Sequence, residues 1–243
     1  MNSEEIVDPC NSCGNKFGNS FCGNCGKPKH LKRINGSYIL SELSSVLNFD
    51  KGILYTIKEL LIRPGKSIQE FILNDRNRLV KPILFIIITS LVYTLSQQLL
   101  HFEDGYVNLE SSEVSATKHI FEWISSHYGY ANILMALIIG FWVKLFFQKY
   151  DYNFFEILIL LCYTMGMGML IFASIGAIKS VFNHKVVDVG FIFGIVYISW
   201  AIGQFFEKGK KMNFLKAFLS YMIGMFSFFL FAFALGSLID WIG

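Results

Sequence analysis

Charged residues are scarce in this sequence, and their scarcity excludes an ordinary soluble domain. Asp, Glu, Lys and Arg make up only 16 % of the 243 residues, whereas hydrophobic residues make up 53 % and the mean hydropathy is +0.47. A chain of this composition needs lipid as its main solvent. The 25 phenylalanines agree, because Phe enters hydrocarbon without a polar atom that needs a partner. The composition therefore predicts a membrane protein.

The sequence also lacks the signatures by which common enzyme classes are recognised. It contains no HExxH or HxxxH spacing, no Walker loop, no nucleophile elbow and no pair of aspartates within an apolar stretch. We therefore expect a non-catalytic protein. The net charge of only +3 gives no reason to expect nucleic-acid binding, since the lysines and arginines are placed as a topology signal.

A third shortage concerns residues 1–30, which have almost no aliphatic core and cannot fold by burying apolar surface alone. They carry two CxxC pairs instead, each followed by Gly: Cys10 with Cys13, and Cys22 with Cys25. No secretory signal precedes them, so we expect a reducing cytosolic location that favours metal ligands over disulfides. Four thiolates suit a closed, structural zinc site, which predicts a mini zinc ribbon. Two disulfides, an iron–sulfur centre and a redox pair are the alternatives.

Residues 31–82 combine helical apolar spacing with basic residues, which predicts amphipathic helices at about 39–47 and 53–61 and a short third helix from Ser67. Pro64-Gly65 ends the second helix. One interpretation places the basic side chains on the anionic inner leaflet or on a protein partner. The other is a helical hairpin that packs on the protein itself. The basic candidates for these contacts are Arg63, Lys66, Arg76, Arg78 and Lys81.

Residues 83–243 contain five apolar stretches, each able to approach the roughly 20 residues that cross a bilayer as a helix. Helices are expected because a backbone in lipid must satisfy its own hydrogen bonds. The fold class predicted is thus membrane all-α, a five-helix transmembrane bundle with juxtamembrane amphipathic helices. The five stretches are about 83–100, 128–147, 154–178, 186–206 and 215–239.

The charges between the stretches predict the orientation. The segment before residue 83 and the loop at 208–216 are basic, whereas the loop at 101–130 is acidic. Basic loops stay inside, so we expect the N-terminus in the cytosol and, after five crossings, the C-terminus outside. Lys179 and Lys185 fall on the outer side and count against this scheme.

Two ionisable residues near the cytosolic ends of neighbouring stretches are candidates for a hydrophilic pathway. Lys144 and Glu156 would line such a pathway or pair with each other. The structural interpretation is that Lys144 snorkels to the headgroups and that Glu156 sits in the favourable first turn of its helix.

Small residues four apart predict close helix packing in the last two stretches. The pairs are Gly190 with Gly194 and Ala232 with Gly236. Such faces serve mostly for packing within one chain, and association into a homo-oligomer is the alternative.

Several motifs in the first third resemble the domain-of-unknown-function 3667 family of bacterial membrane proteins, which join a double-CxxC ribbon to an Arg-Pro-Gly segment and several membrane helices. The resemblance covers residues 10 to about 95. It implies this architecture and the four cysteine ligands, in a multi-pass protein of the bacterial inner membrane, and it implies no activity. The motifs are the cysteines between 10 and 25, NFDKG at 48–52, TIKELLIRPG at 56–65, RNR at 76–78 and KP at 81–82.

The leading hypothesis from these features is an inner-membrane protein anchored in the lipid bilayer, whose cytosolic zinc-ribbon module contacts a protein partner. An oligomeric channel, pore or lipid/solute transporter gated by the N-terminal module is one alternative. A membrane accessory of a nucleic-acid-targeting defence system is another.

Overall fold

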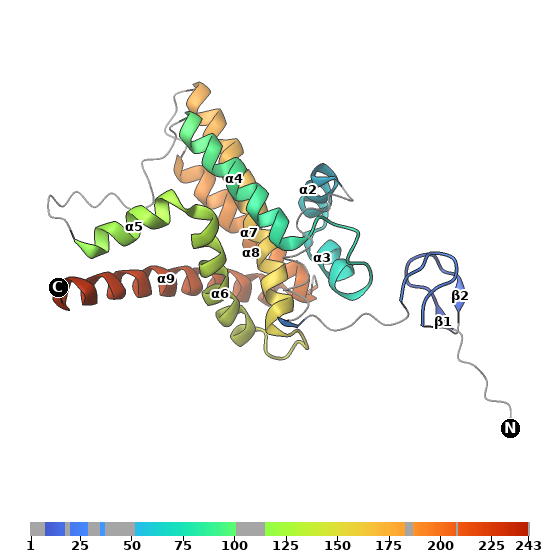
Figure 1. The fold of residues 1–243 in the computed structure, drawn as a ribbon. Coiled ribbons are helices and arrows are strands. Elements are labelled where there is room, and N and C mark those ends of the chain that lie inside the picture. Colours follow the sequence, from blue (N-terminus) through green and yellow to red (C-terminus); the bar gives the residue numbers. More distant parts are fainter. Residues whose placement is uncertain are drawn as a thin grey trace.

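The computed structural model is helical apart from a small N-terminal ribbon (Figure 1). It describes residues 8–17, 20–28, 35–36, 52–100, 115–182, 187–207 and 209–242, so the amphipathic helix predicted at about 39–47 and most of the acidic loop lie outside the described residues. In the ribbon, β1 (Asp8–Pro9) pairs antiparallel with β2 (Lys16–Phe17). The helices are α2 (Ile53–Ile62), α3 (Pro64–Leu73), α4 (Pro82–Leu100), α5 (Ala116–Ser126), α6 (Tyr128–Phe146), α7 (Phe154–Phe182), α8 (Val187–Glu207) and α9 (Lys211–Ile242).

A helix occupies each of the five predicted apolar stretches, but the helices differ in their capacity to cross a membrane. In the described part of the chain, α4, α7 and α9 are each long and apolar enough, and α5 with α6 forms a fourth candidate that is bent by 101°. The apolar part of α8 that can be assessed, Ile192–Glu207, is shorter. A multi-pass membrane protein with three or four candidate crossings is therefore supported, and the count of five stays a prediction.

Two helix ends lie beyond the predicted boundaries. Helix α7 continues to Phe182 and α9 begins at Lys211, because helix propagation adds a hydrogen bond per residue and no proline or glycine stops it there. The hydropathy pattern located the apolar centre of each helix but not its polar ends.

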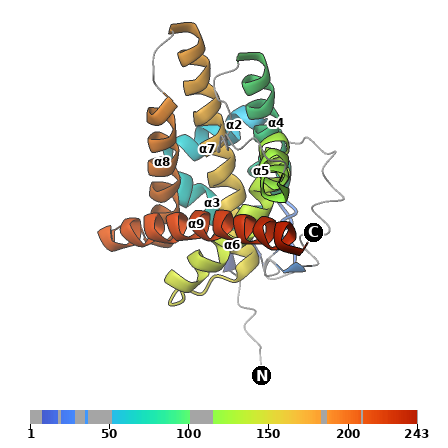
Figure 2. The same ribbon diagram turned by 90° about the vertical axis from the view of Figure 1, so that its left-hand side faces the viewer.

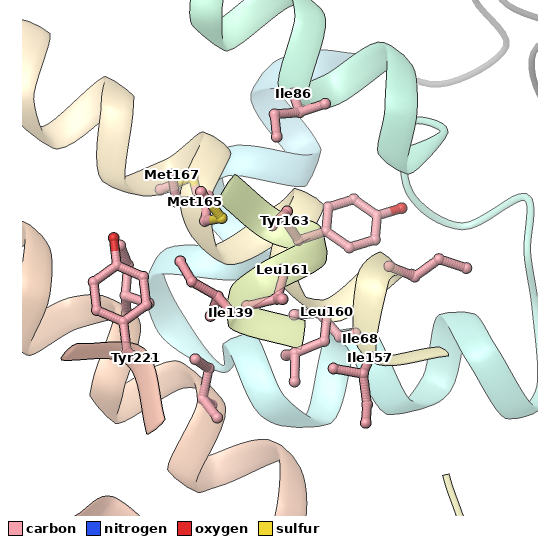
Figure 3. Packing of buried hydrophobic residues seen from close by; sticks show 14 of the residues in the cluster. Ile68, Ile86, Ile139, Ile157, Leu160, Leu161, Tyr163, Met165, Met167 and Tyr221 are labelled. Atoms are coloured by element: carbon pink, nitrogen blue, oxygen red, sulfur yellow. The ribbon is translucent and has the colours of Figure 1, made fainter. Parts of the chain in front are cut away.

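Helix α7 is the centre of the bundle and is buried on most sides. It packs against α4, α6 and α8, and its residues Ile157, Leu160 and Tyr163 are almost fully buried among them (Figure 3). An α-helix that is hydrophobic all round needs either lipid or protein on every side. For α7 most of that cover is protein.

Helix α9 takes a different course from α4, α7 and α8. Both views show it running across these three helices rather than alongside them (Figures 1 and 2). It packs on α6 and α8, and its C-terminal part lies against α5. There Asp240 caps α5 by accepting hydrogen bonds from the backbone N–H of Ala116 and from the Thr117 hydroxyl, at 3.0 Å for the latter. Neither this course nor the bend between α5 and α6 was predicted.

Helices α2 and α3 form a hairpin that packs on the bundle. The third short helix begins at Pro64 and not at Ser67, because proline suits the first position of a helix, where its missing N–H costs nothing. Beside it, a Cβ on Gly65 would lie 2.5 Å from the carbonyl carbon of Gln204 in α8. The side-chain amide of Gln69 then donates to the backbone oxygen of Phe205 at 2.6 Å. The Pro64-Gly65 corner thus permits backbone contact between α3 and α8.

This contact predicts that Gly65→Ala destabilises the protein, because the added methyl group has no room against the α8 backbone. We expect the free energy of unfolding in detergent micelles to fall by about 1–3 kcal/mol, the usual cost of overpacking. Gly52→Ala is the control, since nothing lies within 4 Å of a Cβ there. Equal stability of the two variants would contradict the close α3–α8 approach.

Candidate functional site

The two CxxC pairs fold into two similar turns. In each, the glycine after the second cysteine donates its N–H to the carbonyl of the first cysteine, at 2.9 Å for Gly14 and 2.8 Å for Gly26. Their φ angles of 74° and 72° lie in the left-handed region, which glycine adopts without the steric cost that a Cβ imposes. These turns direct the four cysteine side chains toward one point.

The four sulfur atoms form a compact cluster whose Sγ atoms all lie within 4.8 Å of one another. Cys10 and Cys25 are 3.6 Å apart, as are Cys13 and Cys22. These distances are too long for disulfides, whose sulfurs lie about 2.05 Å apart, and the cysteines are free thiols. A tetrahedral ion with metal–sulfur bonds of about 2.3 Å separates its ligands by about 3.8 Å. The cluster therefore fits a four-cysteine metal site.

The surroundings of the cysteines shift the pKa values of their thiols in opposite directions. Backbone N–H groups of Cys13 and Ser12 lower the pKa of Cys10 to about 6, and the N–H of Asn15 lowers the pKa of Cys13. At Cys25 the N–H of Lys27 also favours the thiolate, but desolvation and the neighbouring thiols raise the pKa to about 12. The first CxxC turn thus favours thiolates, and a thiolate at Cys25 as well calls for a cation among the four sulfurs.

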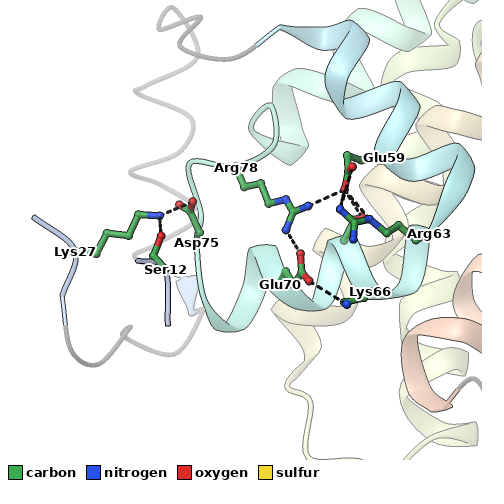
Figure 4. Close-up of polar contacts among 9 residues, drawn as sticks. Ser12, Lys27, Glu59, Arg63, Lys66, Glu70, Asp75 and Arg78 are labelled. Carbon is green, nitrogen blue, oxygen red and sulfur yellow. Dashed lines mark hydrogen bonds and ion pairs between the residues drawn. The ribbon is translucent and has the colours of Figure 1, made fainter. Parts of the chain in front are cut away.

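A lysine joins the ribbon to the helical hairpin. Lys27 Nζ lies 2.6 Å from Ser12 Oγ in the first turn and 2.6 Å from Asp75 Oδ2 just beyond α3 (Figure 4). Asp75 is held in turn, because its N–H donates to the Glu70 carbonyl at 2.9 Å and its carboxylate accepts from the Asn77 N–H at 3.0 Å. The ribbon is therefore anchored at an ordered turn.

Glu59, only 8 % exposed, is the centre of an ionic cluster within the hairpin (Figure 4). Two nitrogens of Arg63 donate to its carboxylate at 3.0 and 3.1 Å, the Ser67 hydroxyl at 3.0 Å and Arg78 at 2.8 Å. Arg78 also pairs with Glu70. We call Glu59, Arg63, Ser67, Glu70 and Arg78 the Glu59 cluster.

The Glu59 cluster favours the charged form of its central carboxylate. Burial opposes ionisation of Glu59, but hydrogen bonds from Ser67 and Arg63, together with the charges of Arg63 and Arg78, lower its pKa below the ordinary value. The cluster is therefore charged at neutral pH.

Most of the basic residues predicted to contact headgroups or a partner have contacts inside the hairpin. Arg63 and Arg78 belong to the Glu59 cluster, and Lys66 lies 3.8 Å from Glu70. Lys81 Nζ is 3.4 Å from Asn77 Oδ1, and Arg76 is partly buried with contacts of its own. These contacts are the kind expected from the second interpretation of this region, a helical hairpin that packs on the protein itself.

Sequence reasoning missed the two carboxylates that organise this site. Glu59 precedes Arg63 by four residues and Lys66 precedes Glu70 by four, which is the spacing of ion pairs on one helix face. This spacing could have been used to predict both ion pairs from the sequence. The ion pair of Glu59 with Arg78 could not have been predicted in this way, because it joins two separate elements.

Lys144 and Glu156 each have a local structural role. Lys144 Nζ donates to the carbonyl of Tyr152 at 2.6 Å. Glu156 accepts from the N–H of Asn153 at 2.7 Å, while the Asn153 side chain accepts from the N–H of Glu156 at 2.9 Å. This reciprocal pair is a capping box at the start of α7. The place of Glu156 in the first turn of α7 is as expected, whereas snorkelling of Lys144 and a pathway or pair formed by the two residues stay predictions.

The predicted small-residue faces lie against neighbouring helices of the same chain. A Cβ on Gly190 would lie 3.2 Å from Ile175, and one on Gly194 would lie 2.9 Å from Phe172, both on α7. In α9 a Cβ on Gly236 would lie 2.6 Å from the Cα of Thr117 in α5. The fourth of these residues, Ala232, is buried.

Comparison with known proteins identifies one segment of the chain. Residues 50–94 match the family model described as "Protein of unknown function (DUF3667)". The match confirms the resemblance over α2, α3 and most of α4, a segment that contains Gly65 and the whole Glu59 cluster. The four cysteines lie outside it. No curated protein and no solved structure matches the chain.

The sulfur cluster predicts stoichiometric metal binding. We expect the full-length protein, purified anaerobically in detergent, to carry about one zinc ion by elemental analysis, because four thiolates form a complete tetrahedral set. Cys22→Ser should lose most of this zinc, whereas Cys162→Ser should keep it, since Cys162 lies on α7 away from the cluster. Zinc-free protein with four reduced thiols would contradict the site.

The Glu59 cluster predicts a pH-dependent contribution to stability. Glu59→Gln removes charge-assisted hydrogen bonds and should cost about 2–3 kcal/mol at neutral pH. Because folding lowers the pKa of Glu59, its stabilisation is present above the ordinary value of 4.5 and is lost as the pH falls through the lowered one. The difference between wild type and variant should therefore shrink in acid, as measured by unfolding in detergent.

The matched control is Glu122→Gln, an exposed side chain on α5, which should change stability little at any pH. A Glu59→Gln protein as stable as this control would show that the cluster is not needed to hold the hairpin.

Proposed function

We propose a role from the geometry, because the family model that residues 50–94 match is described only as a protein of unknown function. The protein is a non-catalytic, five-crossing protein of the bacterial inner membrane that presents a cytosolic zinc ribbon to a protein partner. The observation that carries this proposal is the ribbon itself: a four-cysteine cluster anchored beside the bundle by Lys27, with Phe21 63 % exposed.

Zinc is the ion proposed for the cluster. A site closed by four thiolates leaves no position for a substrate, so its role is to fold the ribbon. The paired strands are only two residues each, and a domain this small needs such a staple. Iron would bind thiolates too, and elemental analysis distinguishes the two.

The orientation follows from the basic ends of the helices. The loops between α6 and α7 and between α8 and α9 meet at one end of the bundle, where the Tyr150 hydroxyl donates to Glu207 at 3.0 Å and accepts from Asn213 at 2.8 Å. Lys149 and Lys210 lie in these loops, and Gln69 of α3 lies beside them. The positive-inside rule supports placing this end in the cytosol.

The exposed Phe21 is the proposed contact for the partner. It lies beside the second CxxC turn, where its backbone bridges to Pro28. Burying a phenylalanine stabilises a complex by about 1.5–3 kcal/mol, so an apolar pocket on a cytosolic protein is the complementary surface. The described residues offer no comparable support for a pore or transporter, since Lys144 and Glu156 have local partners.

A photocrosslinking residue in place of Phe21, tested in native membranes, examines this proposal. We expect one discrete adduct at this position, and its loss when Cys22→Ser is added, because the contact needs the folded ribbon. The control carries the same photocrosslinker in place of Glu122 on α5, on the other side of the membrane in the proposed orientation. Identical adducts at both positions, or none at Phe21, would count against a ribbon-bound partner.

A further inference from the structure

Helix α2 carries an apolar surface that the described protein does not cover. Leu54 is 78 % exposed, Leu61 50 % and Ile62 64 %, and Tyr55 is exposed as well. Their spacing along the chain places them on one side of the helix. We call Leu54, Tyr55, Leu61 and Ile62 the α2 stripe. The opposite side, with Thr56, Glu59 and Leu60, is buried against the bundle.

Hydrogen bonds fix the level of α2 along the bundle. The Tyr197 hydroxyl of α8 donates to the Leu60 carbonyl at 2.9 Å. The Val80 N–H donates to the Thr56 hydroxyl at 3.0 Å, and Val80 itself accepts from the Tyr163 hydroxyl of α7 at 2.7 Å. Tyr163 lies well inside α7, and Tyr197 lies well inside α8. At 1.5 Å per residue, α2 is about 14–15 Å from the ends of α7 and α8 that adjoin the basic loops.

That level coincides with the boundary of the hydrocarbon expected from helix lengths. Helix α7 has 29 residues, so its length of about 43 Å exceeds a hydrocarbon core of about 30 Å by about 13 Å. Helix α4 begins at Pro82, just after Val80, and its 19 residues span about 28 Å. With the far end of α4 at the outer boundary, the inner boundary of the hydrocarbon beside α4 falls at the level of α2.

We propose that α2 is an interfacial helix whose stripe is embedded in the acyl chains of the leaflet on the basic side of the bundle. With ten residues it is too short to cross the bilayer. Lys58, exposed on the same side as the stripe, reaches the lipid phosphates from this depth. Leu91 on α4 is 57 % exposed and provides a reference position for lipid contact.

Tryptophan fluorescence in nanodiscs tests this proposal on the full-length protein. The four native tryptophans are replaced by Phe, and single tryptophans are introduced as Leu61→Trp in the stripe, Leu91→Trp on α4 and Asn77→Trp in the exposed turn before α4. The nanodiscs contain phosphatidylglycerol and a phosphatidylcholine brominated either near the headgroup or near the chain end.

We expect brominated lipid to quench the tryptophan introduced at Leu61 to about the same extent as the one at Leu91. Bromine near the headgroup should quench the tryptophan at Leu61 more strongly than bromine near the chain end does. The one at Asn77 should be quenched by aqueous iodide instead. If the Leu61→Trp protein does not fold, Leu54→Trp provides the same readout.

Quenching of the Leu61→Trp protein by iodide to the extent seen with Asn77→Trp would overturn the proposal, because the stripe would then face water. Protection from both quenchers would overturn it too, in favour of a protein or a second copy on the stripe. Loss of lipid quenching at Leu91 as well would instead put the membrane assignment of α4 in question, which separates that failure from a failure of the stripe.

Discussion

A buried carboxylate, Glu59, sets the arrangement of the segment that links the ribbon to the helical bundle. Glu59 has left water almost completely, and a charge in that position is tolerated only when cations and hydrogen-bond donors surround it. Arg63 supplies them from the end of α2, Ser67 from α3 and Arg78 from the turn before α4. One side chain thereby ties three successive elements together. The Arg-Pro-Gly corner lies inside this unit: Arg63 binds Glu59, Pro64 begins α3, and Gly65 permits the close approach to α8.

The unit joined by Glu59 is also fixed to the bundle through its backbone. Tyr163 and Tyr197 donate to carbonyls of Val80 and Leu60, and such bonds are stronger where water is excluded. Asp75 at the far end of the unit receives Lys27 of the ribbon. A path of direct contacts thus runs from the four cysteines to the helices. Contacts alone do not make a switch, but they hold the ribbon beside the helical hairpin.

Most helices and the cysteine cluster could be predicted from the sequence, but few of the contacts between them could. Apolar length predicted the helices near 83–100, 128–147, 154–178, 186–206 and 215–239, because the capacity to cross a bilayer is a local property. The cysteine spacing predicted the four-sulfur cluster for the same reason. The partnership of Glu59 with Arg78, the bend between α5 and α6, and the course of α9 across the bundle depend on packing between distant segments. Hydropathy and periodicity contain no information about such contacts, so these features appeared only in the structure.

In the topology that we propose, five crossings separate a cytosolic ribbon and hairpin from an external C-terminus, even though α9 runs across its neighbours. A paired topology reporter, fluorescent only in the cytosol and enzymatically active only outside it, distinguishes the two sides of the membrane when it is fused after Gly209 and after Gly243. We expect fluorescence at Gly209 and external activity at Gly243. Fluorescence at both positions would show that α9 does not cross the membrane and would rule out the five-crossing topology.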